Sequence, residues 1–78
     1  MVKASLTPRD EHVAWCKGRA LGYVDAGDLK VAVACMAADL KTHPNTDNPA
    51  LDGLEKIGMI YASDGDKAAV RRWIERFQ

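Results

Sequence analysis

The residue types best suited to chemistry in this 78-residue chain are two cysteines, two histidines and eleven carboxylates. A structural zinc site needs ligands at short spacings such as Cys-x-x-Cys or His-x-x-x-His, and neither spacing occurs. No Asp-x-Asp-x-Asp-Gly run ending in Glu is present, so a calcium loop is not expected. We therefore expect no metal ion, no cofactor, and two free thiols at Cys16 and Cys35 in a reducing cytosol.

Catalysis is not expected from the hydroxyl groups. Serine and threonine are few, and none stands in a pattern that brings a nucleophile, a base and an orienting group together. No glycine-rich loop that would hold a phosphate is present. The sequence favours a protein that is not an enzyme and has no catalytic residues.

Four aspartates lie in or beside two short turns, each of which contains a Gly-Asp pair. Asp25 and Asp28 flank the first turn, and Asp64 and Asp66 flank the second. If both turns lie at one end of the protein, these carboxylates gather there and could bind a divalent cation. Helix N-capping is the simpler explanation for Asp28 and Asp66.

A basic side is expected on the last helix, formed by Lys67, Arg71, Arg72 and Arg76. A solvated helix face, with Arg71 and Glu75 paired one turn apart, explains it without any ligand. The alternative is an anion site for a nucleotide or an acidic protein. Eleven basic and eleven acidic residues balance, so a nucleic-acid binder is not favoured.

Trp15 is placed by helical spacing opposite the apolar stripe of the first helix. Gly18, Arg19 and Gly22 lie near it on the same side. Glycine costs a helix about 1 kcal/mol relative to alanine, and close approach of another helix would offset that cost. We therefore expect a contact surface here. The alternatives are that residues 1–6 cover Trp15, or that it is merely exposed.

The second helix has an unusual second apolar side made of Val31, Ala34, Cys35 and Ala38. A helix that is apolar nearly all round is normally buried on more than one side. These residues either pack on the third or fourth helix, or they extend the contact surface as a subunit interface.

The composition and the apolar spacing predict an all-α domain without a sheet. Twelve of 78 residues are alanine, and β-branched residues are few. We expect a flexible lead-in over 1–6 and a single domain over 7–78, with a hairpin at 7–42, a loop at 43–49 and a hairpin at 50–78. Thr7 and Pro8 would begin the first helix, and the hairpins would stack antiparallel. The expected core includes Tyr23, Ile57 and Tyr61.

The two hairpins form an internal repeat offset by 38 residues. Tyr23 aligns with Tyr61, and the pair Gly27-Asp28 aligns with Gly65-Asp66. In each unit Gly would end one helix and Asp would begin the next. Ala20 and Gly58, one turn before each Tyr, are small enough to let two helices approach. A hairpin cannot bury its apolar stripe alone, so the two units should stack.

The first unit resembles a tetratricopeptide repeat over roughly residues 13–46. Ala20, Tyr23, Ala32, Met36 and Pro44 match that family's spacing, whereas Cys16 and Arg19 replace its Trp and Leu. The run Cys16-Lys17-Gly18-Arg19-Ala20-Leu21-Gly22-Tyr23, continuing to Asp28-Leu29 and His43-Pro44, resembles a family of small proteins encoded by phages of actinobacteria. That resemblance implies an accessory phage protein in the bacterial cytoplasm and supplies no catalytic residues.

These observations favour a protein–protein interaction module that self-associates or binds a bacterial host protein. The alternatives are an oligomeric binder of an anionic, nucleotide-like small molecule or a counter-defence protein and, less favoured, a DNA-associated regulator. The longest uncharged apolar run, Val31 to Ala38, is too short to span a membrane, and residues 1–6 do not resemble a secretory signal. We expect a cytoplasmic protein without membrane contact.

Overall fold

The computed structural model describes residues 8–44 and 46–77, and these ranges hold four helices and no strand. The helices are α1 (Pro8–Asp25), α2 (Leu29–Lys41), α3 (Leu51–Ser63) and α4 (Lys67–Glu75). The predicted all-α fold of four helices is therefore confirmed. The lead-in expected at 1–6 and the cap expected at Thr7 lie outside the described residues. None of these helices is long and apolar enough to cross a membrane.

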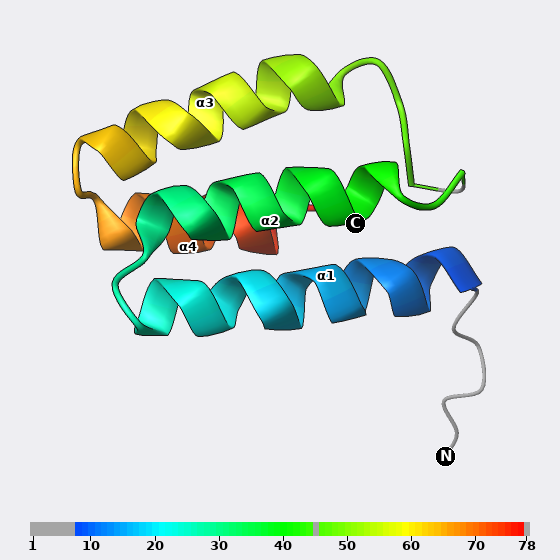
Figure 1. Ribbon diagram of the computed structural model, residues 1–78, viewed down its shortest axis with the longest axis horizontal. Coiled ribbons are helices and arrows are strands. Elements are labelled where there is room, and N and C mark those ends of the chain that lie inside the picture. Colours follow the sequence, from blue (N-terminus) through cyan, green and yellow to red (C-terminus); the bar gives the residue numbers. More distant parts are fainter. Residues whose placement is uncertain (1–7, 45, 78) are drawn as a thin grey trace.

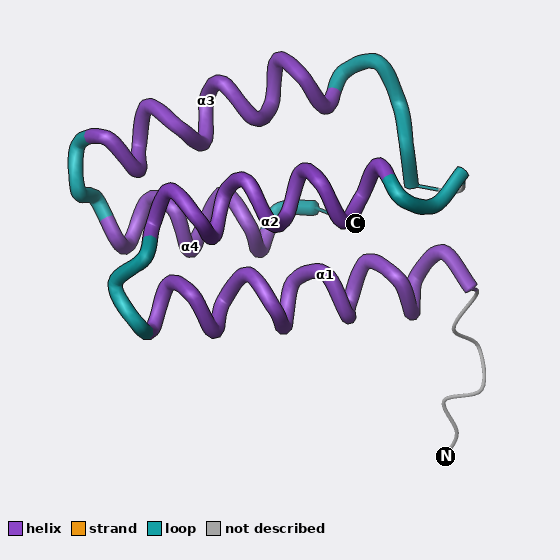
Figure 2. Tube along the Cα trace, viewed as in Figure 1, coloured by secondary structure: helices purple, strands orange, loops and turns teal. Residues whose placement is uncertain are grey.

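Three helices lie side by side and antiparallel, and the fourth lies behind them (Figure 1). α2 is central, and α4 packs against α1, α2 and α3. α1 and α3 lie on opposite sides of α2, and none of their Cα atoms come within 8 Å of each other. The second hairpin thus folds back so that α4 covers the rear of α2. Both short turns lie at the same end of the protein, as predicted (Figure 2).

The first turn has the hydrogen bonds of a Schellman motif. Gly27 has a φ of 86°, which lies in the left-handed region. Its N–H donates to the carbonyl of Val24 at 3.0 Å, and the N–H of Asp28 donates to the carbonyl of Tyr23 at 2.9 Å. The last carbonyls of α1 are thereby satisfied within the turn.

The second turn repeats this pattern. Gly65 has a φ of 70°, its N–H donates to Ala62, and the N–H of Asp66 donates to Tyr61 at 3.1 Å. The 38-residue repeat is therefore a repeat of turn geometry. The two aspartates differ, because the Asp66 side chain caps α4 by accepting from Ala69, whereas the Asp28 side chain makes no cap hydrogen bond to the described residues. Asp28 thus occupies the predicted N-cap position of α2, but the hydrogen bond expected of its side chain is not formed.

The core lies where α2 meets the other three helices. It contains Val13, Cys16, Ala20, Val24, Ala32, Val33, Met36, Leu40, Leu51, Ala62, Val70, Trp73 and Ile74. Three residues expected in it are exposed: Tyr23 and Tyr61 at 36% and Ile57 at 44%. The reason lies in α3, which turns Leu51, Gly58 and Ala62 inward. Ile57 and Tyr61 then fall on its flank, and Tyr23 lies at the end of α1.

Gly58 of α3 packs directly against Trp73 of α4 and Val33 of α2. A Cβ atom there would lie 2.8 Å from Cε2 of Trp73 and 2.9 Å from Cγ1 of Val33. The indole of Trp73 fills this space, and its Nε1 donates to the carbonyl of Leu54 at 3.0 Å. Only glycine leaves room for this arrangement, which bears out the expectation that a small residue before Tyr61 lets two helices approach.

Gly58→Ala should therefore destabilise the protein even though alanine is the better helix former. The added methyl group overlaps a buried indole and a buried valine, and overpacking of this kind costs about 1–3 kcal/mol. Gly53→Ala is the matched control, because nothing lies within 4 Å of its Cβ position. We expect urea unfolding to show a lower free energy for the first variant and an equal or higher one for the second. Equal stability of Gly58→Ala and the parent chain would contradict this packing.

The turn glycines give a second prediction. Gly27→Ala and Gly65→Ala should each lower the free energy of unfolding by about 1 kcal/mol or more, because a Cβ atom is unfavourable at positive φ. Neither position has an atom within 4 Å of a new Cβ, so strain in the backbone is the whole cause. Thermal unfolding followed by circular dichroism measures the loss. Unchanged melting temperatures in both variants would show that the turns tolerate another conformation.

Candidate functional site

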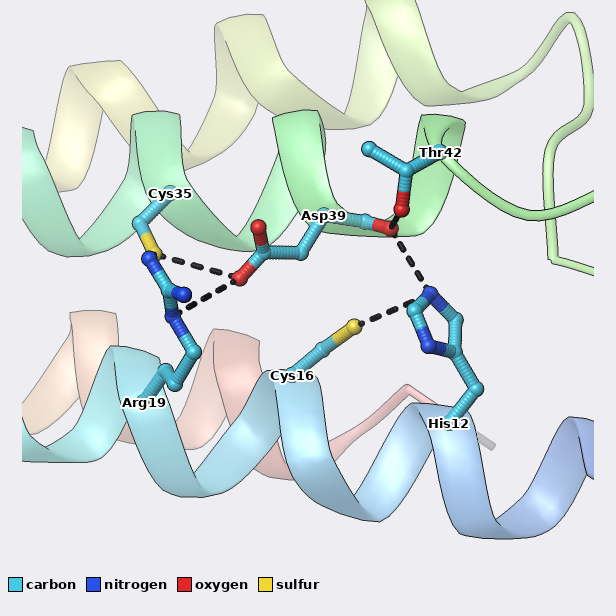
Figure 3. A network of polar contacts seen from close by, with 6 residues as sticks. All are labelled: His12, Cys16, Arg19, Cys35, Asp39 and Thr42. Carbon is cyan, nitrogen blue, oxygen red and sulfur yellow. Dashed lines mark hydrogen bonds and ion pairs between the residues drawn. The ribbon is translucent and has the colours of Figure 1, made fainter.

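A cluster of six residues joins α1 to α2, and we call it the Asp39 cluster (Figure 3). Its members are His12, Cys16, Arg19, Cys35, Asp39 and Thr42. Asp39 lies at the centre, because both its carboxylate and its main-chain carbonyl accept hydrogen bonds. The cluster links α1 and α2 through an ion pair and several hydrogen bonds.

The Asp39 carboxylate holds Arg19 in place. Nε of Arg19 lies 3.2 Å from Oδ2 of Asp39, and the thiol of Cys35 donates to the same oxygen at 3.3 Å. Nη2 of Arg19 also donates to Sγ of Cys35 at 3.6 Å. Because the Asp39 side chain is only 14% exposed, this ion pair is screened less by water than a surface pair. Arg19 is thereby fixed along the α1–α2 seam.

The Asp39 carbonyl ties the start of α1 to the end of α2. Nε2 of His12 donates to it at 2.8 Å, and Oγ1 of Thr42 donates to it at 2.7 Å. Sγ of Cys16 lies 3.6 Å from the same imidazole nitrogen. His12 is thereby half-buried against α2. The carbonyls in the last turn of a helix lack partners within the helix, so an imidazole donor from α1 is well placed here.

Both thiols are held in the protonated form. Burial raises the pKa of Cys16 to about 11, and the nearby charge of Asp39 adds to this effect. Burial, followed by the hydrogen bond to Asp39, also raises the pKa of Cys35. Both cysteines are free. Since the thiolate is the nucleophile and the metal ligand, this cluster is suited to neither role. The described residues contain no group of three or more ligands that could hold a metal ion.

Trp15 projects from α1 beside this cluster and is 51% exposed. Its indole stacks on the His12 ring with centroids 5.7 Å apart. The guanidinium carbon of Arg19 lies 4.8 Å above the Trp15 ring centre, within cation–π range. Trp15 is therefore held from two sides while half of its surface remains open to solvent.

The residues predicted to form a contact surface lie on α1 and α2 and are exposed to different degrees. Trp15, Gly18, Arg19 and Gly22 are exposed on α1, and a Cβ atom at either glycine would meet nothing within 4 Å. On α2, Val31 is 48% exposed and Ala38 is exposed, whereas Ala34 and Cys35 are half-buried. Packing on α3 or α4 is therefore not the role of Val31 and Ala38. Other positions of α2 do that packing: Ala32, Val33, Met36, Ala37 and Leu40.

The predicted basic side of α4 is divided by the fold. Arg71 pairs with Asp25 of α1, so the expected pairing with Glu75 is not found. Arg72 and Arg76 instead line a groove between α3 and α4, and Lys67 lies outside it. The four residues therefore do not form one anion site.

The groove between α3 and α4 was not predicted from the sequence. Its volume is about 560 Å³. The residues that line it are Leu54, Ile57, Tyr61, Asp66, Ala69, Arg72, Trp73, Arg76 and Phe77. Three aromatic rings and two arginines converge there, which is a combination typical of binding sites.

The Asp39 cluster has a signal in the sequence. Arg19 and Cys35 are each eight residues from Gly27, and His12 and Thr42 are each fifteen residues from it. Folding the chain about the Gly27 turn places such pairs opposite each other in an antiparallel hairpin. The groove has no comparable signal, because it depends on the angle at which α4 leaves α3.

Comparisons with family models, with curated proteins and with solved structures find no match to this chain. The described residues place the protein in the all-α fold class, with four helices. The resemblances to tetratricopeptide repeats and to small phage proteins remain expectations from the sequence.

The Asp39 cluster predicts a pH dependence of thiol reactivity. Only thiolate reacts with iodoacetamide, so the raised pKa of Cys16 should place its half-maximal alkylation rate near pH 11. Asp39→Asn should shift the alkylation profiles of Cys16 and Cys35 to lower pH, because the Asp39 charge raises the pKa of each. Mass spectrometry of the two cysteine peptides measures each rate separately.

Asp25→Asn is the control for this measurement, because its carboxylate pairs with Arg71 and contacts neither thiol. If the alkylation profiles of the two thiols do not shift in Asp39→Asn, or shift equally in Asp25→Asn, the Asp39 carboxylate does not raise their pKa.

Proposed function

We propose that this chain is a non-enzymatic protein–protein interaction module that self-associates through the surface centred on Trp15. The observation that supports it is the state of Trp15, which is half exposed and yet fixed between His12 and Arg19. An aromatic side chain ordered before binding loses little conformational entropy on association. Tryptophan and arginine are also the residues most enriched among those that dominate binding energy.

A second copy of the chain fits this surface by shape. Trp15, Gly18, Arg19 and Gly22 form one stripe along α1. In an antiparallel crossing of two α1 helices centred between positions 18 and 19, Trp15 of one copy faces Gly22 of the other. Arg19 likewise faces Gly18. Each large side chain meets a glycine, so the stripe is self-complementary, as a two-fold interface requires.

The neighbouring side of α2 extends this surface. Val31 and Ala38 are exposed on it, with Ala34 and Cys35 between them and half-buried. A helix lying along α1 would cover part of this small apolar side, and desolvation of apolar surface favours association. The resemblance to small phage proteins suggests where the module acts. We propose that it is a phage accessory protein that engages a host factor in the bacterial cytoplasm.

The test is the molar mass in solution of variants on α1. Trp15→Ala should weaken self-association by about 2 kcal/mol or more, which is about thirtyfold in the dissociation constant. Gly18→Leu should abolish it by steric clash while slightly raising the stability of the monomer, because leucine is the better helix former. Light scattering after size exclusion and analytical ultracentrifugation measure both effects.

Gly53→Leu is the matched control, because Gly53 also lies in a helix with nothing within 4 Å of its Cβ position. It should gain helix stability and keep the molar mass of the parent chain. If the parent chain is monomeric over the whole concentration range, or if Gly18→Leu and Gly53→Leu behave alike, self-association through this surface is wrong. If deletion of 1–6 and Trp15→Ala both lower the melting temperature at unchanged molar mass, the N-terminal segment covers Trp15 instead.

A further inference from the structure

The groove between α3 and α4 combines an apolar floor with an uncompensated basic rim. Trp73 forms the floor, and it is fixed there by its hydrogen bond to Leu54 and by the edge-on contact with Phe77, whose ring centre is 4.9 Å away. Leu54 and Phe77 are partly buried, whereas Ile57 and Tyr61 on the α3 wall are 44% and 36% exposed. Apolar surface of this kind, gathered in a concave site, is typical of an interaction surface.

Arg72 and Arg76 lie one turn apart on the other wall. Neither has an ion-pair partner in the described ranges, in contrast to Arg19 and Arg71, which each pair with an aspartate. Two like charges at this spacing repel each other slightly, so the free protein retains them at a cost. An acidic ligand in the groove would remove that cost and supply the missing partners.

The groove also has a direction. Asp66 lines it at the N-terminal end of α4, and the two arginines line it in the C-terminal half. From Asp66 to Phe77 the groove extends about 16 Å at the helical rise per residue, which corresponds to about three turns of a docked helix. Because α4 packs behind α2 and reaches α1, this flank of α3 is left without a covering helix in the described structure (Figure 1).

We propose that this groove binds an acidic amphipathic helix of a partner protein. The partner helix runs antiparallel to α4, with carboxylates near its own N-terminus opposite Arg72 and Arg76. Its apolar side chains cover Ile57, Tyr61 and Trp73. Acidic residues also favour the N-terminal turn of a helix, so the charge pattern and the helix dipole agree on this direction. The groove is long, open along α3 and partly apolar, which suits a helix better than a compact anion.

This proposal does not rest on self-association through Trp15, because every residue that lines the groove lies on α3, on α4 or close to their ends. Trp15→Ala should leave peptide binding to the groove unchanged. The two proposals can therefore fail separately.

The experiment uses the full chain and capped synthetic peptides of about four helical turns, which is near the shortest length at which an isolated helix forms in water. The acidic peptide carries two glutamates four residues apart in its first two turns and leucines along the same side. Sister peptides replace both glutamates by glutamine or by lysine. Titration calorimetry should show saturable binding of one acidic peptide per chain, with weaker binding of the glutamine peptide and the weakest binding of the lysine peptide.

Charge reversal then tests the arginines. The double change Arg72→Glu and Arg76→Glu should weaken binding of the acidic peptide at least about tenfold. It should strengthen binding of the lysine peptide, because the charges of the two partners are then exchanged. Lys67→Glu is the matched control, since it reverses a charge on the same helix outside the groove. It should change binding of the acidic peptide by less than about twofold, because exposed charges away from an interface are screened.

The apolar wall is tested with a second matched pair. Ile57→Asp places a charge inside the groove and should abolish binding, whereas Ile60→Asp changes a residue that is 60% exposed and does not line it. Both side chains are exposed in the free protein, so circular dichroism should show folded variants in each case.

Four outcomes would overturn the proposal. The first is that the acidic peptide shows no saturable binding, and the second is that Lys67→Glu weakens peptide binding as much as the double variant does. The third is that octanoate displaces the peptide with an affinity equal to that of the peptide, and the fourth is that the parent chain self-associates without peptide and the double variant does not. The last two would assign the groove to a small amphiphilic anion or to a second copy.

Discussion

The indole of Trp73 lies in the space that Gly58 leaves open, between α3, α4 and Val33 of α2. This contact sets how closely α4 approaches α3 and fixes the rotation of α3 about its axis. Because Gly58 is turned inward, Leu51 and Ala62 also face the core. Ile57 and Tyr61 lie on another side of the helix and remain exposed. The exposed wall of the α3–α4 groove is therefore a direct consequence of one close-packed position.

Polar contacts determine the other half of the molecule. α1 and α2 bury small side chains such as Ala20 and Ala32, which permit close approach but contribute little apolar area. The Asp39 cluster adds an ion pair and two hydrogen bonds to the last-turn carbonyl of α2. The same contacts order the surface, because Arg19 and His12 hold the exposed Trp15 between them.

Two surfaces of different character result. The Trp15 surface has small residues at Gly18 and Gly22, with open space above them, and is suited to a second helix of the same kind. The α3–α4 groove is concave, aromatic and basic, and it is suited to a ligand of opposite charge. A chain with equal numbers of acidic and basic residues thus carries two arginines, Arg72 and Arg76, that have no ion-pair partner in the described ranges.

The sequence by itself determined the four helices, the ends of α2, and both turns. These features depend on local signals, namely the spacing of apolar residues, a proline at a helix start, and a glycine followed by aspartate at a turn. Each signal acts over a few residues, so it can be recognised without the fold. The sequence also indicated that Trp15 lies away from the core stripe. Only the tertiary structure decided the partner of Arg71, the exposure of Ile57 and Tyr61, and the groove. Each of these depends on the angle and rotation at which α4 packs behind α2, and side-chain volumes at Gly58 and Trp73 set that geometry across fifteen residues of chain.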